Sequence, residues 1–208
     1  MKDNRKKLKS IDFQMLEAIN SRGRGAVFVP TDFLNLGSRQ AVDIVLHRLV
    51  QKGTIRRLSR GIYDFPEEHS VLGKLQPSPE KIAEALVERD CTRIQPAGAY
   101  AANILGLSEQ VPAKVVFLTD GPSRTVKIGA TTIQLRRTTP KNMAMAGRLS
   151  GLLIQALREL GKKNMTTERV EHLKRILPIE KRQELLKDIR LAPAWMHSIF
   201  KKLAEEIV

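Results

Sequence analysis

The chain has 208 residues, 42% of them hydrophobic and 4% aromatic, and its 36 Lys and Arg against 22 Asp and Glu give a formal net charge of +14. This composition is typical of a globular protein with one or two domains; it excludes fibrous and disordered chains, and no apolar run is long enough for a transmembrane helix. The basic excess favours a polyanionic partner, most often nucleic acid, and the single cysteine is typical of a reducing cytoplasm.

Residues 1–66 predict short elements in the order of a winged helix-turn-helix. Ser10 caps a first helix, and Ser38 caps a third helix that ends at Gly53. The elements are a helix from 11, a strand at 27–29, a helix at 31–34, a helix from 39, and strands at 54–58 and 62–64. This segment is therefore predicted to be a DNA-binding domain, in which the third helix enters the major groove and the hairpin forms a wing on the backbone.

The expected DNA contacts lie on the third helix and the wing. When the apolar side of that helix is buried, Arg39 can bond guanine and Gln40 can bond adenine. Thr31 begins the second helix, where a phosphate is favoured. The full set is Thr31, Ser38, Arg39, Gln40, Asp43, His47, Arg56, Arg57, Ser59 and Arg60. Two alternatives stay open: a winged helix that binds protein, and helix charges that are only a solvated surface.

Two flanking segments are less informative. The tail from Lys2 to Lys9 either adds non-specific phosphate contacts or is a frayed, solubilising end. The run EEHSVLGKLQPSP, which begins at residue 67, is polar with two prolines and one glycine, so we predict a linker over residues 67–77.

Residues 78–208 predict a mixed α/β domain followed by a helical tail, which makes the whole chain α+β. Ser78 and Pro79 begin a helix, and Gly129-Ala130 joins two alternating segments as a hairpin. The other elements are strands at 93–95 and 115–118, helices at 97–105 and about 145–160, and three further helical patterns. The expected result is a small β-sheet with helices, in which Pro178 and Pro193 begin helices of the tail.

A one-signed strip of charge runs through this second domain. Between Gly121 and Arg158 the sequence holds no Asp or Glu. Its cations are Arg124, Lys127, Arg136, Arg137, Lys141, Arg148 and Arg158. The strip is a possible second anionic contact surface, for DNA or for an acidic protein, or else a solvated face.

No arrangement of residues predicts catalysis, a metal or a cofactor. The four histidines, His47, His69, His172 and His197, are scattered. Cys91 is interpreted as a small buried residue and Asp120 as part of a turn. Gly37-Ser38 has the start of a nucleotidyltransferase motif, but no Asp-x-Asp or Asp-x-Glu pair follows to hold a metal. We therefore expect a protein that is not an enzyme.

Two runs of sequence resemble one family. VFVPTDFLNLGSRQAVDIVLHRLVQKGTIRRLSRGIYDFP resembles the N-terminal domain of the AbiEi antitoxins, and QPAGAYAANILGLSEQVPAKVVFLTDGPSRTVKIG resembles the start of their C-terminal domain. The resemblance implies an antitoxin of a type IV toxin–antitoxin module, which serves in phage defence by abortive infection. The N-terminal domain would bind operator DNA as an autorepressor. The C-terminal domain would counteract a nucleotidyltransferase-like toxin, without need of a stable complex.

Two other functions remain open. One is a plain winged-helix transcription regulator with a ligand- or protein-sensing C-terminal domain, which requires a pocket with convergent polar groups. The other is a nucleic-acid-processing enzyme whose catalytic acids are not evident from spacing.

Overall fold

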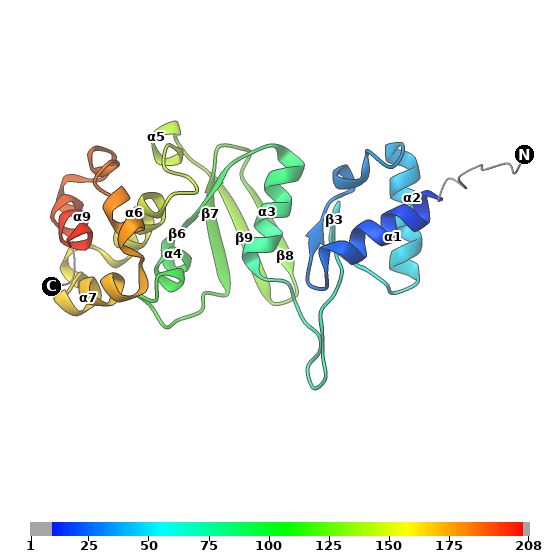
Figure 1. Ribbon diagram of the computed structural model, residues 1–208, viewed down its shortest axis with the longest axis horizontal. Coiled ribbons are helices and arrows are strands. Elements are labelled where there is room, and N and C mark those ends of the chain that lie inside the picture. Colours follow the sequence, from blue (N-terminus) through cyan, green and yellow to red (C-terminus); the bar gives the residue numbers. More distant parts are fainter. Residues whose placement is uncertain (1–9, 206–208) are drawn as a thin grey trace, which may run out of the picture. The chain divides into compact units, whose positions relative to one another are not determined.

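The computed structural model, drawn in Figure 1, describes residues 10–205. The chain divides between Cys91 and Thr92 into two compact units. We call them the N-terminal unit and the C-terminal unit. The fold is α+β, as the sequence predicts: a winged helix-turn-helix precedes a mixed α/β unit with a helical tail. Within residues 10–205, every helix is too short or too polar to cross a membrane.

The N-terminal unit has the predicted order of elements. They are α1 (Ile11–Arg22), β1 (Val27–Phe28), the 3-10 helix η1 (Pro30–Phe33), α2 (Arg39–Gln51), β2 (Arg56–Ser59) and β3 (Ile62–Asp64). The strands form an antiparallel sheet in the order β1-β3-β2. The second helix of the motif is thus a single 3-10 turn, which Pro30 begins.

Local signals at the helix ends explain where α1 and α2 begin. The Ser10 hydroxyl accepts a hydrogen bond from the Phe13 N–H, and the Ser38 hydroxyl accepts one from the Ala41 N–H, both at 3.3 Å. Such caps satisfy backbone donors that the first turn leaves free. The core beneath them joins both helices to the sheet and consists of Met15, Ile19, Phe28, Phe33, Val42, Val45, Leu46, Leu49, Ile55 and Tyr63.

The segment after β3 differs from the expected linker. Residues 67–77 include a short antiparallel hairpin of exposed residues, β4 (Glu68–His69) with β5 (Gly73–Lys74). The next helix, α3 (Pro79–Asp90), clusters with the N-terminal unit, where it packs against β1 and β3. Because the boundary between compact units follows α3, the first unit extends 25 residues beyond the predicted limit at residue 66.

Polar contacts also hold α3 to its unit. The Lys81 ammonium donates to the Gly25 carbonyl at 3.1 Å, and the Arg89 guanidinium donates to the Arg60 carbonyl at 3.1 Å. Cys91, interpreted from the sequence as buried, is exposed: it ends α3 in the left-handed conformation, with φ of 51°.

The C-terminal unit is built on a mixed sheet. Its strands and first helix are β6 (Ile94–Ala97), α4 (Gly98–Ile104), β7 (Lys114–Thr119), β8 (Arg124–Ile128) and β9 (Thr131–Arg137). The strand order is β6-β7-β9-β8, with β7 parallel to β9 and the other pairs antiparallel. The predicted Gly129-Ala130 hairpin is confirmed, since Ile128 pairs with Thr131 and Gly129 has a φ of 57°.

Helices complete this unit, and Figure 1 shows the last of them in yellow to red. They are α5 (Pro140–Met143), α6 (Leu149–Leu160), η2 (Lys162–Asn164), α7 (Thr167–Ile176), α8 (Ile179–Glu184), η3 (Ile189–Leu191), η4 (Ala194–Met196) and α9 (His197–Ala204). Helix α6 is shorter than predicted but ends at Gly161 as expected. A continuous apolar core joins α4, α6, α7 and α9, with Leu153, Leu157 and Phe200 at its centre.

Strand alternation gives the sheet two unlike sides. Val115, Phe117, Ile133 and Leu135 are buried on one side, and Tyr100 of α4 packs edge-on against Phe117. On the other side of β7, β8 and β9, the positions of Lys114, Lys127, Thr132, Gln134 and Arg136 are exposed or half-buried, while Leu118 is buried in a small cluster with Ala97 and Met143. This polar side carries part of the predicted basic strip.

Candidate nucleic-acid interface

The outward side of α2 presents a short, mostly uncharged strip. Because Val42, Val45, Leu46 and Leu49 are buried, residues 40, 44 and 47 lie along the opposite side, one turn apart. Gln40 and His47 are exposed there as predicted. Between them Ile44 is 46% exposed.

Ile44 is a contact candidate that the sequence prediction missed. The available signal was an aliphatic residue on the polar side of an amphipathic helix. Such a residue can contact the methyl group of thymine in the major groove, while Gln40 can bond adenine.

The cations beside this strip are engaged with carboxylates. The Nε of Arg39 lies 3.1 and 3.0 Å from the two oxygens of Asp43, one turn along α2. Arg48 pairs with Asp12 of α1 at 3.2 Å. All four side chains are largely exposed, and exposed pairs are worth only about 0.2–1 kcal/mol. Arg39 can therefore leave Asp43 for a guanine at small cost.

Arg56, predicted as a wing contact, is instead held inside the N-terminal unit. Its guanidinium donates from Nε to Asp64 Oδ1 at 3.1 Å and from Nη2 to Asp64 Oδ2 at 2.5 Å. Nη2 also donates to the carbonyl of Leu75 at 2.6 Å. The Asp64 side chain is only 1% exposed. Arg56 thus neutralises a buried carboxylate and ties the segment after β5 to the sheet.

Arg57 and Arg60 remain as exposed cations of the wing. Neither side chain forms an ion pair or hydrogen bond with another residue of the described range 10–205. Gly61, with φ of 71°, allows the chain to reverse between β2 and β3. Ser59, the last residue of β2, is half-buried. Two guanidinium groups at one turn suit contacts with phosphate.

The predicted phosphate position at Thr31 has a carboxylate beside it. Thr31 is exposed, but the Asp32 carboxylate accepts a hydrogen bond from the Val29 N–H at 3.2 Å, and Arg22 pairs with Asp32 at 2.6 Å. This carboxylate occupies the end of η1 where an anion was expected. The basic tail from Lys2 to Lys9 lies outside the described residues.

The basic strip of the C-terminal unit does not form one continuous surface. Lys127 and Arg136 lie on the polar side of the sheet, whereas Arg124 lies on the opposite side, together with the buried Val126. Arg137 ends β9 and Lys141 lies on α5, both exposed. The strand alternation that buries the apolar residues separates these cations.

Arg148 is removed from the strip by an ion pair. Its Nη1 lies 2.9 Å from Asp188 Oδ1, and the other oxygen of Asp188 accepts a hydrogen bond from the Ser150 hydroxyl. Asp188 is largely buried, so this carboxylate neutralises Arg148 as Asp64 neutralises Arg56.

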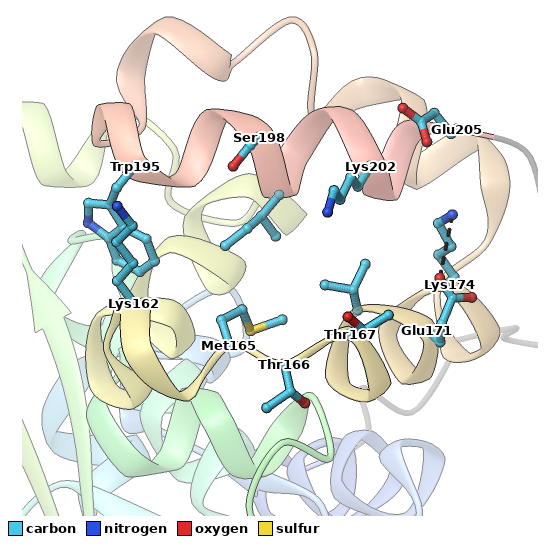
Figure 2. Close-up of a pocket in the computed structure, with 12 residues that line it drawn as sticks. Lys162, Met165, Thr166, Thr167, Glu171, Lys174, Trp195, Ser198, Lys202 and Glu205 are labelled. Atoms are coloured by element: carbon cyan, nitrogen blue, oxygen red, sulfur yellow. Dashed lines mark ion pairs between the residues drawn. The ribbon is translucent and has the colours of Figure 1, made fainter.

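A separate cleft of about 410 Å³ lies between α7 and α9. Figure 2 shows Trp195 and Lys162 at one end and Glu171, Lys174 and Glu205 at the other. Lys174 pairs with Glu171 at 3.7 Å. Charges of both signs alternate around this cleft, an arrangement that does not favour a polyanion.

Asp120 and His172, both considered for catalysis, have structural partners. The Asp120 carboxylate accepts hydrogen bonds from the backbone N–H and the guanidinium of Arg93, each at 2.8 Å. These bonds hold the pKa of Asp120 below its ordinary value of 3.8. Nε2 of His172 lies 3.2 Å from the Leu105 carbonyl oxygen. Over residues 10–205, no three or more His, Cys, Asp or Glu side chains are grouped so as to hold a metal ion.

Among solved structures, the RV2827C protein from Mycobacterium tuberculosis is similar, with 15% sequence identity, a TM-score of 0.47, and coverage of 95% of this chain and 83% of that chain. No curated protein matches the sequence. A family of unknown function, DUF6088, matches residues 14–185. Since this match spans most of the sequence, the chain belongs to the DUF6088 family.

Proposed function

We propose that this protein is a DNA-binding autorepressor that acts as the antitoxin of a toxin–antitoxin module. The DNA-binding part rests on one observation: the exposed strip of α2 belongs to the same winged helix-turn-helix unit as the wing guanidiniums of Arg57 and Arg60, which form no ion pair within residues 10–205. This combination matches what reading a duplex requires: a helix for the base edges and cations for the backbone.

The proposed contacts divide into sequence-specific and non-specific ones. Gln40 and Ile44 would contact base edges, adenine for the amide and a thymine methyl for the aliphatic side chain, with Arg39 reaching guanine after release from Asp43. Arg57 and Arg60 would contact phosphates, which fix the register of the unit on the duplex. The net charge of +14 supports the proposal, since it attracts a polyanion over distance.

The antitoxin part of the proposal is supported by the resemblance to AbiEi antitoxins within residues ~25 to ~140. The expected toxin is a nucleotidyltransferase-like protein, encoded beside this gene, that the C-terminal unit counteracts. Co-expression of that toxin with the full chain tests this part. Wild type and a variant with both Gln40→Ala and Arg57→Gln should relieve growth arrest equally, because DNA binding is assigned to the other unit. Arrest that only the wild type relieves would contradict the assignment.

The DNA-binding part is tested by fluorescence anisotropy with two duplexes, the region upstream of the gene and a scrambled sequence, over a range of salt concentrations. Arg57→Gln with Arg60→Gln should weaken binding to both duplexes and reduce the slope of log K against log salt by about 0.9 for each phosphate that the wing no longer neutralises. Gln40→Ala should weaken binding to the upstream duplex alone, by about 5- to 150-fold, the equivalent of about 1–3 kcal/mol.

Lys163→Gln with Arg175→Gln is the matched control, because it removes two exposed cations from the C-terminal unit. Salt slopes that fall equally for the wing variant and this control would show that only net charge matters. Equal affinities of the Gln40→Ala variant and wild type for the upstream duplex would remove α2 as the reading helix.

A further inference from the structure

A polar cleft of about 400 Å³ lies on the C-terminal unit, at the end of β9. Arg136 of β9 and Thr138, the residue after β9, line one part of the cleft. The other polar lining residues are Asn142 of α5 and Gln155, Arg158 and Glu159 of α6. Its volume falls in the range of small-molecule sites. Neither DNA binding nor the antitoxin role, as proposed above, uses it.

The charged groups of this cleft do not neutralise one another. Arg136 and Glu159 form no ion pair or hydrogen bond with other side chains of residues 10–205, and Arg158 has no carboxylate partner there. By contrast, Arg56 and Arg148 each hold a largely buried carboxylate. The cleft therefore presents two guanidiniums and a carboxylate together, all available to a ligand.

The hydrogen bonds within the cleft fix which groups can donate. The Asn142 amide donates from Nδ2 to Thr138 Oγ1 at 2.8 Å, and its Oδ1 accepts from Arg158 Nη1 at 3.2 Å. Because the Thr138 oxygen already accepts a hydrogen bond, its own O–H is left to donate. Arg136, Arg158 and Thr138 thus form a set of donors suited to the oxygens of a phosphate.

Gln155 adds an amide to the wall of the cleft. The residue is 7% exposed and lines the cleft. No hydrogen bond joins its amide to another residue of the described chain. Neither amide atom is fully buried without a partner, so the amide meets the open space of the cleft and can bond a polar ligand there. Glu159 lies one turn further along α6 and offers two more acceptors.

We infer that this cleft binds a small sugar phosphate. The phosphate would be held by Arg136, Arg158 and the Thr138 hydroxyl, and the sugar hydroxyls would donate to Glu159 and bond the Gln155 amide. The lining side chains are polar apart from one leucine and include no aromatic ring on which a nucleobase could stack, which favours a sugar over a nucleotide. The inference does not rest on the proposed DNA binding, which concerns the other unit.

Isothermal titration calorimetry of the full chain tests the inference. The probes are glycerol 3-phosphate, ribose 5-phosphate and glucose 6-phosphate, with inorganic phosphate and the free sugars as references. At least one sugar phosphate should bind ten times or more tightly than inorganic phosphate and than its free sugar. Arg136→Gln and Arg158→Gln should each weaken that binding at least tenfold, and Arg136→Lys, which keeps the charge but loses the planar fork, should weaken it as well.

Glu159→Gln separates the two halves of the ligand. Loss of the carboxylate should strengthen the binding of inorganic phosphate. It should also lower the preference for the sugar phosphate over inorganic phosphate. Arg175→Gln is the control, an exposed arginine on α7 outside the cleft. The inference is overturned if no probe binds, if Arg175→Gln weakens binding as much as Arg136→Gln, or if duplex DNA displaces the sugar phosphate and Arg136→Gln reduces DNA binding alone.

Discussion

The pair of Arg56 and Asp64 gives the sharpest prediction for stability. Arg56→Met would leave the Asp64 carboxylate, 1% exposed, without its two charge-assisted hydrogen bonds, and would leave the Leu75 carbonyl without a donor. Removing one partner of a buried ion pair costs about 3–5 kcal/mol. Because Arg56 itself is 23% exposed, water can replace part of this interaction, so we expect a loss of stability at the lower end of that range. Such a loss is a large part of the roughly 5–15 kcal/mol that stabilises a typical domain.

Urea unfolding of the full chain measures this loss as a change in the free energy of unfolding. Arg57→Met is the matched control, since Arg57 is the next residue on β2 and is exposed, and its effect should stay within about 0.5 kcal/mol. The double variant Arg56→Met with Asp64→Leu should lose less free energy of unfolding than Arg56→Met alone, because it leaves no unpaired charge in the interior.

Two results would refute this reasoning. Equal losses for Arg56→Met and Arg57→Met would mean that the ion pair adds nothing beyond an ordinary surface side chain. A double variant less stable than Arg56→Met would mean that Asp64 stabilises the unit without Arg56.

Two further predictions concern the C-terminal unit. Gly151→Ala in α6 should destabilise the protein by about 1–3 kcal/mol in thermal unfolding, although alanine favours helix. The added Cβ would overlap the Met145 carbonyl oxygen and approach Gln95 Oε1. A raised melting temperature would contradict this prediction. The pKa of the Asp120 carboxyl, measured by NMR, should lie below 3.8, and Arg93→Gln should raise it. Because the folded state lowers this pKa, the ionised carboxyl stabilises the fold above pH 3.8, and that stabilisation is lost as the pH falls through the lower folded-state pKa. A titration midpoint at or above 3.8 would contradict the assignment.

Helix starts were predictable because they depend on nearby residues alone. Ser10, Ser38 and Ser78 were each predicted as N-caps, and each hydroxyl accepts a hydrogen bond from the backbone N–H three residues later. The Gly129-Ala130 hairpin was predictable for the same reason. These signals need no knowledge of the tertiary structure.

The pairing of Arg56 with Asp64 could not be predicted because the wing contains one irregularity in strand register. Ser59 pairs with Ile62, and a regular hairpin counted from that pair would place Arg57 opposite Asp64. The register shifts between Arg57 and Ser59, so that Arg56 faces Asp64 instead. Such a bulge adds one residue to one strand and leaves no clear mark in a sequence, which is why three wing arginines looked equivalent.

The arrangement around the cleft was beyond prediction for a different reason. β9 lies between β8, its hairpin partner, and β7, with which it pairs in parallel through a crossover. Only this order brings Arg136, at the end of β9, close to residues of α5 and α6. The sequence predicted one basic strip on a sheet face and the following helix, whereas the strands place Lys127 and Arg136 on one side of the sheet and Arg124 on the other.

The exposure of the carboxylate partner decides which arginines are available to phosphate. Asp64 and Asp188 are largely buried, so releasing Arg56 or Arg148 would leave a charge unpaired in the interior. Asp43 is about half exposed, and water can solvate it when Arg39 departs. The ion pair between Arg39 and Asp43 should therefore weaken at a much lower salt concentration than the ion pair between Arg56 and Asp64. The net charge of +14 therefore overstates the number of cations available to bind an anion, because Arg56 and Arg148 are already paired with largely buried carboxylates.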